Sequence, residues 1–577
     1  DGEVNVNGAM LVSGSGGVNV NDAIDVSGNL TFNAVQSGAD IVITGNGSIT
    51  KSSGPDATLT FKTDNIKLQS GSSIASTAGR LNVIFWAEQP ATGGGYISLD
   101  GTSIDTNGGG LAMAGQDATT NWVPYDGATA ITIPDGTPYS GGPGLLVKDT
   151  TIETLGGNLR AKGRTINNSG NTNNFGLYIT GSTVQTGAGD QYWFGSYGRD
   201  SNTASYLSGI EINDSTVSST TGDIQIEGQI EVSGNVVDGN GLRIGSLGGS
   251  ANTSATGNVS ITTTSGNIVL QGDQKTSAVS GDGYAISLVT LGTDTVTIGS
   301  QGGDITLTGN ASSTAGVDRG IHINGASANA VSIDANGGAI GLTGSFPTHS
   351  VAGQIDHGIH TTDLNVLNSG AGAITITGDA TNSASTGAVR GITFESTRIQ
   401  TDLGSIDITG TAGKASNNSR GVTVENNTLS VLSASGAIRV VDQSPADQTT
   451  GSTYNGLYLQ PSANNNIVFG ADGANVATSS SAVTIRADKL GFLGNTSLVN
   501  TSGAVVVESV NASFTAAPDL SLLSIAGNPS GARIGQTSNT SNVTTGSVTA
   551  AGPISIYGGN MAINEALTAS SNTISLT

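Results

Sequence analysis

A glycine-led unit recurs along the chain and constrains its fold more than any other feature. From Gly144 onward, a glycine followed by an alternating stretch such as Leu145–Val147 returns every 30 to 42 residues. The later openings are Gly176, Gly209, Gly241, Gly283, Gly320, Gly358, Gly391, Gly421 and Gly456. A repeat of this length is typical of a supersecondary unit that buries its apolar face only against neighbouring copies.

Each unit holds two further short strands, and every strand alternates apolar and polar residues. The third strand follows a glycine turn and carries an inward pair, as in Ile224/Ile226, Ile268/Leu270, Ile305/Leu307, Ile340/Leu342, Ile374/Ile376, Ile406/Ile408 and Ile438/Val440. Such alternation buries one strand face and leaves the other in water. We therefore predict an all-β fold, a right-handed parallel β-helix (β-solenoid) with three short strands per coil and loop insertions. Ile305 should lie in register with Ile340, about 4.8 Å away.

The pattern divides the chain into four consecutive parts of one continuous solenoid. Residues 1–115 are predicted to form N-terminal β-helix coils, 116–143 an insertion loop, 144–460 the regular repeat coils, and 461–577 less regular C-terminal coils. Within the regular part, variable loops are expected between the third strand and the next opening glycine, for example at 310–319, because loops can lengthen there at little thermodynamic cost.

Composition excludes several classes of function. The 577 residues contain no cysteine, which removes disulfides and thiol chemistry. The formal net charge of −23 argues against nucleic acid as a partner, since polyanions would be repelled. No apolar run of eighteen residues is present, so no membrane insertion is expected.

Several short stretches resemble the filamentous-haemagglutinin type of large exoprotein. They are Val4–Gly8, Gly93–Gly101, Ile104–Gly109 and Ala551–Asn560, followed by Ile563 and Asn564. The resemblance covers essentially the whole chain. It implies a right-handed β-helix that reaches the surface of a Gram-negative cell by two-partner secretion or a similar route. There it would be a secreted, non-catalytic adhesin, fibre shaft or stalk, which presents loops to cell-surface glycans or to host or neighbour-cell receptors.

The chain departs from the complete family pattern at its ends. It has neither the Asn-Pro-Asn motifs of the family's secretion domain nor a C-terminal membrane barrel, and it opens at Asp1 without a signal peptide. Both ends run out within the repeat pattern. Unpaired strand edges invite pairing, so we expect the edges to be covered by flanking coils of the same polypeptide or by neighbouring copies in a fibre.

Aromatic residues are distributed unevenly and supply the candidate ligand-binding site. Thirteen of the twenty-four aromatic residues lie between Phe85 and Tyr206. Flat exposed rings can stack on sugars or on a protein partner. The proposed binding residues are Trp122, Tyr125, Tyr192, Trp193, Phe194 and Tyr197. The alternative is that these rings form a small core that packs the insertion onto the solenoid.

A β-helical polysaccharide-degrading enzyme, a lyase or a hydrolase, is the alternative function. Such enzymes need clustered acids, or acids with Arg or Lys, in a groove on one face. The basic cluster of Arg160, Lys162 and Arg164 is the best candidate, and its first two members should point outward. Because exposed charges usually serve solubility, we favour a solvated face, assign no catalytic residue and predict that the chain is not an enzyme.

Metal and cofactor sites are weighed on two groups of residues. His322 and His360 follow their opening glycines by two positions and should stack on an outer face, with His349 or His357 as a third ligand if a metal were bound. Two exposed residues without a ligand are the favoured interpretation, so no metal site is assigned. Asp223 and Asp304 occupy equivalent turns, where they can bond the backbone or contribute to a structural calcium site.

Overall fold

The computed structural model describes residues 4–6, 8–34, 36–87, 95–114, 120–122, 131–133, 138–139, 143–166, 174–199, 207–236, 239–245, 257–279, 282–313, 317–327, 330–346, 355–368, 370–381, 388–413, 419–445, 456–464, 466–471, 479–570 and 572–577. Across these ranges the chain is built from strands and turns, and none of them contains a helix capable of crossing a membrane.

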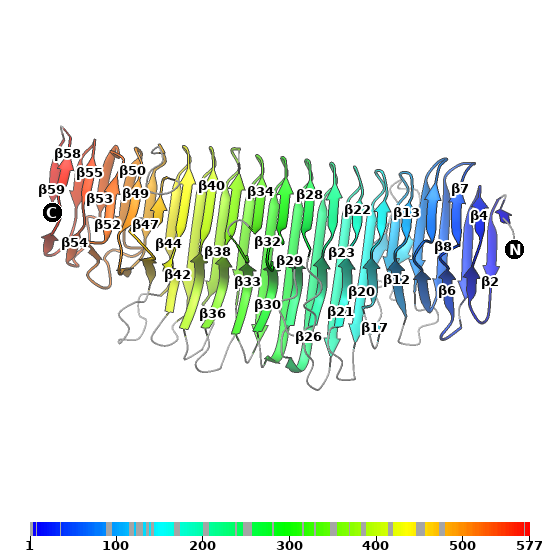
Figure 1. Cartoon of the computed structure of the whole chain (residues 1–577). Helices are drawn as coiled ribbons and strands as arrows, with labels where there is room; N and C mark the ends of the chain where they lie inside the picture. Colours follow the sequence, from blue (N-terminus) through cyan, green and yellow to red (C-terminus); the bar gives the residue numbers. More distant parts are fainter. Residues whose placement is uncertain are drawn as a thin grey trace. The chain divides into compact units, whose positions relative to one another are not determined.

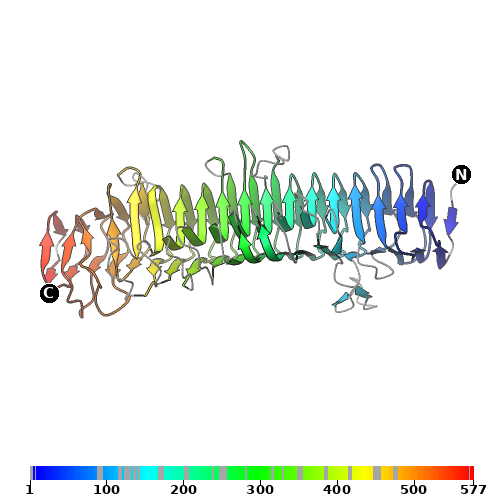
Figure 2. The same ribbon diagram turned by 90° about the horizontal axis from the view of Figure 1, so that it is seen from below.

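The chain comprises two compact units, and each is a right-handed parallel β-helix as predicted. Unit 1 contains residues 1–281 and 294–300, and unit 2 contains residues 282–293 and 301–577. In both units the three strands of a coil belong to three parallel sheets, here named A, B and C. Sheet C holds the strand after the opening glycine, sheet A the second strand and sheet B the third. Figure 1 shows these parallel strands stacked in chain order, and Figure 2 shows the same stacks from below.

The strands of unit 1 have the following bounds. Sheet A contains β1 (Val4–Val6), β4 (Ala23–Val26), β7 (Ser48–Lys51), β10 (Ser73–Ser76), β13 (Ser103–Asp105), β19 (Thr151–Glu153), β22 (Thr183–Gln185), β25 (Thr216–Ser219), β28 (Val259–Thr263) and β31 (Val296–Ser300). Sheet B contains β2 (Met10–Ser13), β5 (Leu30–Ala34), β8 (Ala57–Thr63), β11 (Leu81–Trp86), β14 (Leu111–Ala114), β17 (Pro138–Tyr139), β20 (Leu159–Ile166), β23 (Gln191–Arg199), β26 (Ile224–Val236) and β29 (Ile268–Val279). Sheet C contains β3 (Val18–Val20), β6 (Asp40–Ile43), β9 (Asn65–Leu68), β12 (Tyr96–Asp100), β18 (Leu145–Lys148), β21 (Asn174–Thr180), β24 (Leu207–Asn213) and β27 (Gly239–Gly245). A separate antiparallel pair is formed by β15 (Thr120–Trp122) and β16 (Ile131–Ile133).

The strands of unit 2 follow the same scheme. Sheet C contains β30 (Asp282–Val289), β33 (Val317–Asn324), β36 (Ile355–Thr362), β39 (Ala388–Glu395), β42 (Ser419–Asn427), β45 (Leu457–Pro461) and β48 (Leu490–Phe492). Sheet A contains β34 (Val331–Ala335), β37 (Leu364–Asn368), β40 (Thr397–Thr401), β43 (Leu429–Ser433), β46 (Ile467–Phe469), β49 (Ser497–Asn500), β52 (Leu523–Ala526), β55 (Val548–Ala550) and β58 (Leu567–Ala569). Sheet B contains β32 (Ile305–Ser313), β35 (Ile340–Ser345), β38 (Ile374–Ala380), β41 (Ile406–Ala412), β44 (Ile438–Asp442), β47 (Val483–Arg486), β50 (Ala504–Glu508), β53 (Gly531–Ile534), β56 (Ile554–Ile556) and β59 (Ile574–Leu576). Three further strands, β51 (Asp519–Leu520), β54 (Val543–Thr545) and β57 (Met561–Ile563), form a small parallel sheet.

The core of each unit consists of vertical columns of like side chains. In unit 2 Ile305 pairs with Ile340, and Ile340 with Ile374, which confirms the predicted register. All three isoleucines are at most 1% exposed. In unit 1 the Phe61 ring lies between Phe32 and Phe85, with centroid distances of 5.2 and 5.1 Å. Because a single coil cannot enclose these side chains, each column is buried only by stacking.

Several of the opening glycines are required by close backbone approach rather than by turn geometry, whereas Gly283 lies two residues before the crossing, which Ala285 occupies opposite Gly320. At Gly358 an added Cβ would lie 2.5 Å from the backbone nitrogen of Asp379, and at Gly344 it would lie 2.1 Å from the carbonyl oxygen of Gly358. The start of a sheet C strand therefore crosses the end of a sheet B strand where neither residue has a side chain. Among these openings only Gly456 has a positive φ, so at the others that the structure describes a left-handed backbone is not the reason for glycine.

The predicted variable loops are partly strand. Residues 310–319 were expected to be a loop, yet β32 runs to Ser313 and β33 begins at Val317. Beyond the glycine crossing, these extensions build small secondary cores, such as the cluster of Ala285, Ala311 and Phe346. Most of the predicted insertion 116–143 lies outside the described residues.

Candidate functional site

The outer face of sheet B in unit 1 gathers aromatic and basic side chains from successive coils. Side chains of β23 alternate between the core and the outer face. Trp193 lies on the core side, so the flanking residues Tyr192 and Phe194 point outward, and both are partly exposed. The same alternation in β20 buries Leu159 and Ala161 and turns Arg160 and Lys162 outward, as predicted. Register pairing then places Arg160 beside Tyr192 and Lys162 beside Phe194.

Cation–π contacts and hydrogen bonds link these side chains. Lys62 Nζ lies 4.7 Å from the ring centroid of Trp86, and Lys162 Nζ lies 5.7 Å from that of Phe194. Tyr192 donates its hydroxyl proton to Glu227 Oε2 over 3.3 Å. Tyr192 and Trp86 also pack against the small cluster of Ile84 and Ala114. The rings are thus held in place while one side of each stays accessible.

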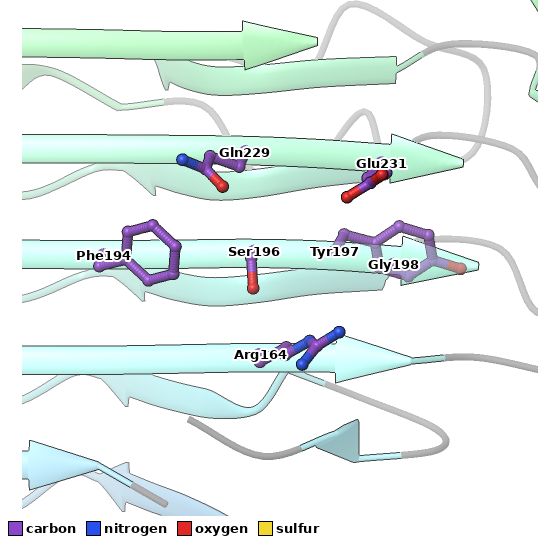
Figure 3. A pocket seen from close by; sticks show the side chains of 7 residues that line it. All are labelled: Arg164, Phe194, Ser196, Tyr197, Gly198, Gln229 and Glu231. Atoms are coloured by element: carbon purple, nitrogen blue, oxygen red, sulfur yellow. The ribbon is translucent and has the colours of Figure 1, made fainter. Parts of the chain in front are cut away.

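A shallow hollow of about 210 Å³ lies on this face (Figure 3). Its lining comes from three consecutive sheet B strands and consists of Arg164, Phe194, Ser196, Tyr197, Gly198, Gln229 and Glu231. Figure 3 shows Arg164 on one strand, Phe194 and Ser196 on the next, and Gln229 and Glu231 on the third. Two aromatic rings beside hydroxyl, amide, guanidinium and carboxylate groups suit a polar ligand with a planar apolar face.

Of the six predicted binding residues, Trp193 is misplaced, whereas Tyr197 lines the hollow but is largely buried. Trp193 is 0% exposed and its Nε1 donates to Gln191 Oε1 over 3.0 Å, so the indole belongs to the core and cannot contact a ligand. Its register partners are Ala161 and Ile226, which shows that it occupies the inward position of the repeat. Tyr197 is 1% exposed and packs with Leu207, Ile230 and Val232 in a secondary core.

The remaining predictions divide between the described and undescribed parts of the chain. Tyr192 and Phe194 lie on the outer face, together with the basic cluster that was considered separately. Tyr125 lies outside the described residues, and of Trp122 the structure describes only its place at the end of β15. Trp86, Gln229 and Glu231 were missed; continuing the alternation of Ile224 and Ile226 along β26 would have placed Gln229 and Glu231 on the outer face, but this segment was expected to be a loop.

The histidines stack as predicted but are not exposed. His322 pairs with His360 in register, and their ring centroids lie 5.7 Å apart. His322 is only 7% exposed and the His360 side chain only 14%, so the expectation that these two histidines are exposed is wrong. Within the described ranges, no three His, Cys, Asp or Glu side chains are grouped so that they could hold a metal ion, and His349 lies outside those ranges.

The aspartates considered for calcium bond the backbone of the next coil. Asp223 Oδ1 accepts a hydrogen bond from the Asn267 N–H over 2.7 Å, and Asp304 Oδ1 accepts one from the Ala339 N–H over 2.7 Å. Asp190 and Asn158 make the equivalent bond one and two coils before Asp223. These side chains therefore form a structural ladder along one corner.

Two buried carboxyl groups have strongly shifted pKa values. Burial raises the pKa of Glu211 to about 7 against the opposing effect of Arg243, its register partner. Burial likewise raises the pKa of Asp442 to about 6, although Ser444 donates to Asp442 Oδ1 from both its N–H (2.9 Å) and its hydroxyl (2.5 Å). Both residues are closed to substrates, at 0% and 3% exposure.

Asp442→Asn is expected to stabilise unit 2 above neutral pH. The unfolded carboxyl releases its proton near pH 3.8, while the folded one keeps it to about pH 6, so folding stability falls as the pH rises across this interval. Asparagine keeps the acceptor for Ser444 and removes this cost, roughly 3 kcal/mol at most. Thermal unfolding should show a higher midpoint for the variant at pH 8 and equal midpoints at pH 3.5. Equal midpoints at both pH values would contradict the shift.

Comparison with protein-family models, curated proteins and solved structures gives no match for this chain.

Proposed function

We propose that the chain is a non-catalytic scaffold of a secreted bacterial surface protein that binds glycan chains on the outer face of sheet B in unit 1. The observation that carries the proposal is one hollow lined from three successive strands, where Arg164, Ser196 and Gln229 lie in register and Phe194 lines the hollow beside them. Adhesion to a cell surface and location outside a Gram-negative cell rest on the resemblance to filamentous-haemagglutinin-type exoproteins.

The physical properties of this face favour a glycan chain as the ligand. Sugar rings present a C–H face that stacks on aromatic rings and hydroxyl groups that bond to amide and charged side chains. Tyr192 and Trp86 extend the aromatic surface beyond the hollow, so adjacent sugars of one chain would find further contacts. A shallow face on a rigid sheet admits a polymer without a conformational change of the backbone.

The alternative of a polysaccharide-degrading enzyme draws on the same hollow. Arg164 and Glu231 both line the hollow. Lyases and hydrolases use a carboxyl group and a cationic side chain in their active sites. The two functions differ in one measurement, because an enzyme releases new reducing ends or unsaturated products and a binding surface does not.

Phe194→Ala is expected to weaken glycan binding about two- to tenfold, since a stacked aromatic contact contributes roughly 0.5–1.5 kcal/mol. Binding of the full chain to immobilised neutral and acidic polysaccharides would be measured by biolayer interferometry, with product release assayed in parallel. Tyr192→Ala should act in the same direction.

Thr375→Ala is the matched control, because Thr375 is exposed on the outer face of sheet B in unit 2. It should leave binding unchanged. Equal binding by wild type and both aromatic variants would reject the glycan surface, and product release would transfer the assignment to an enzyme.

A further inference from the structure

The outer face of sheet C in unit 2 carries two adjacent columns of buried polar residues. One column runs through Arg319, His357, Arg390 and Arg420, each opposite the next in register. The second runs through His322, His360, Thr393 and Thr423. His357 is 3% exposed, His322 7% and Arg420 4%, although all lie on the side of the sheet opposite to the main core.

The rings of these columns form one continuous stack. The centroid of Tyr284 lies 4.3 Å from that of His322, which lies 5.7 Å from His360, which in turn lies 4.8 Å from His357. Both ring nitrogens of His357 are buried and, within the described ranges, have no hydrogen-bond partner. Stacked imidazoles at these distances are compatible with neutral rings, whereas adjacent imidazolium ions would repel each other.

Charged groups surround the histidines from every neighbouring strand. Arg319 Nη1 donates to the Tyr284 hydroxyl over 3.3 Å, and Glu395 Oε1 lies 3.2 Å from His360 Nε2. Glu425 Oε2 accepts from Arg390 at 2.9 Å and from Arg420 at 3.0 Å. Asp356 lies buried in β36 itself, and Asp379 lies in β38, which packs against β36. With neutral histidines, three arginines already accompany the two glutamates Glu395 and Glu425, and imidazolium charges would add to this positive charge.

The environment of His357 and His360 favours their neutral forms. Burial lowers the pKa of His357 well below 6.5, and the charges of Arg319 and Arg390 lower it further. Burial also lowers the pKa of His360, against the opposing effect of Glu395. The hydrogen bond from His360 in turn lowers the pKa of Glu395.

We propose that the stacked histidines of β33 and β36 form an acid-sensitive latch, which holds the starts of the sheet C strands closed when neutral and releases them when protonated. The parts released are the residues that precede the glycine crossings, around Arg319, His357 and Arg390. These residues lie beyond the main core, so they can open while the inward columns of isoleucine and leucine stay stacked.

The direction of the pH effect follows from linkage. A histidine whose pKa is lower in the closed form than in the open form contributes full stability above about pH 6.5 and loses it as the pH falls. Each histidine that takes up one proton on opening raises the opening constant about tenfold per pH unit below that value. Two histidines acting together would raise it about a hundredfold per unit.

Hydrogen–deuterium exchange of the full chain tests the latch. Peptides covering β33, β36 and β39 should lose at least about tenfold in protection between pH 6.5 and pH 5.5, after correction for the intrinsic exchange rate. Peptides covering β10 and β13 in unit 1, which contain no histidine, should not change. Equal protection of β36 at both pH values in the wild type would overturn the proposal.

Variants separate titration of the histidines from general acid instability. The double variant His357→Gln/His360→Gln should lose the pH response. Thr393→Ala, a buried non-titrating change in the same column, should lower protection equally at both pH values and keep the response. If the double variant fails to fold at pH 7.5, His322→Gln is measured instead and should reduce the response. A response that persists in the variants would assign the acid sensitivity to other groups and reject the latch.

Discussion

Gly404→Ala is expected to lower the free energy of unfolding of unit 2 by about 3 kcal/mol or more. An added Cβ would lie 1.9 Å from the carbonyl oxygen of Gly372 and 2.9 Å from Thr401 Oγ1. Gly372 is itself in equally close contact with Gly338, so the backbone cannot shift to relieve the clash without disturbing the next coil. Overpacking typically lowers the free energy of unfolding by about 1–3 kcal/mol when neighbouring side chains can move aside. A backbone carbonyl cannot move aside in this way, so we expect a loss of about 3 kcal/mol or more.

Gly341→Ala is the matched control for this substitution. At Gly341 in β35 an added Cβ would meet only Thr306 Oγ1, at 3.9 Å. This alanine should be neutral or should stabilise by about 0.5 kcal/mol, because it restricts the unfolded chain. Both variants would be compared by urea unfolding followed by circular dichroism. Equal stabilities of the two variants would show that the glycine ladder at the corner is dispensable.

Phe61→Ala is expected to destabilise unit 1 by about 3–5 kcal/mol, the range for removing a buried phenylalanine side chain. The substitution empties the space between Phe32 and Phe85, whose rings lie 5.2 and 5.1 Å from that of Phe61. Because each coil is covered only by its neighbours, the loss should appear as reduced hydrogen-exchange protection of β5, β8 and β11.

Phe194→Ala is the control for Phe61→Ala, since it removes the same side chain from the outer face of the same sheet. It should cost less than about 1 kcal/mol, as expected for a surface position. A similar loss of protection in both variants would contradict the assignment of Phe61 to the core and Phe194 to the surface.

Period-two alternation was sufficient to predict the fold. The pairing of Ile305 with Ile340 depends on local spacing and on the repeat, and both can be read from the sequence. The sequence did not reveal why the opening residues are glycine. A glycine at a tight corner and a glycine at a crossing of two backbones have the same sequence signature, and only the contact between Gly344 and Gly358 distinguishes them.

The candidate site was predicted in part. Tyr192 and Phe194 lie outward because alternation places them there, whereas Trp193 lies inward at a position that isoleucine holds in the next coil. Strict application of the same alternation would have separated them. The stacking of His322 with His360 could be predicted from the repeat, but its burial could not, because it also involves the ring of Tyr284 in the preceding coil.

The glycine corner has a further consequence for how such a chain can change in length. Gly404 contacts Gly372, and Gly372 contacts Gly338, through the same backbone atoms at the same distance. Loss of residues 372–403 by unequal recombination would place Gly404 directly against Gly338. Gly338 would then meet the same kind of glycine backbone that it meets now at Gly372. Gain or loss of whole coils is therefore structurally neutral, whereas insertion of a few residues within a strand is not, and lineages of this protein should differ in coil number more readily than in coil size.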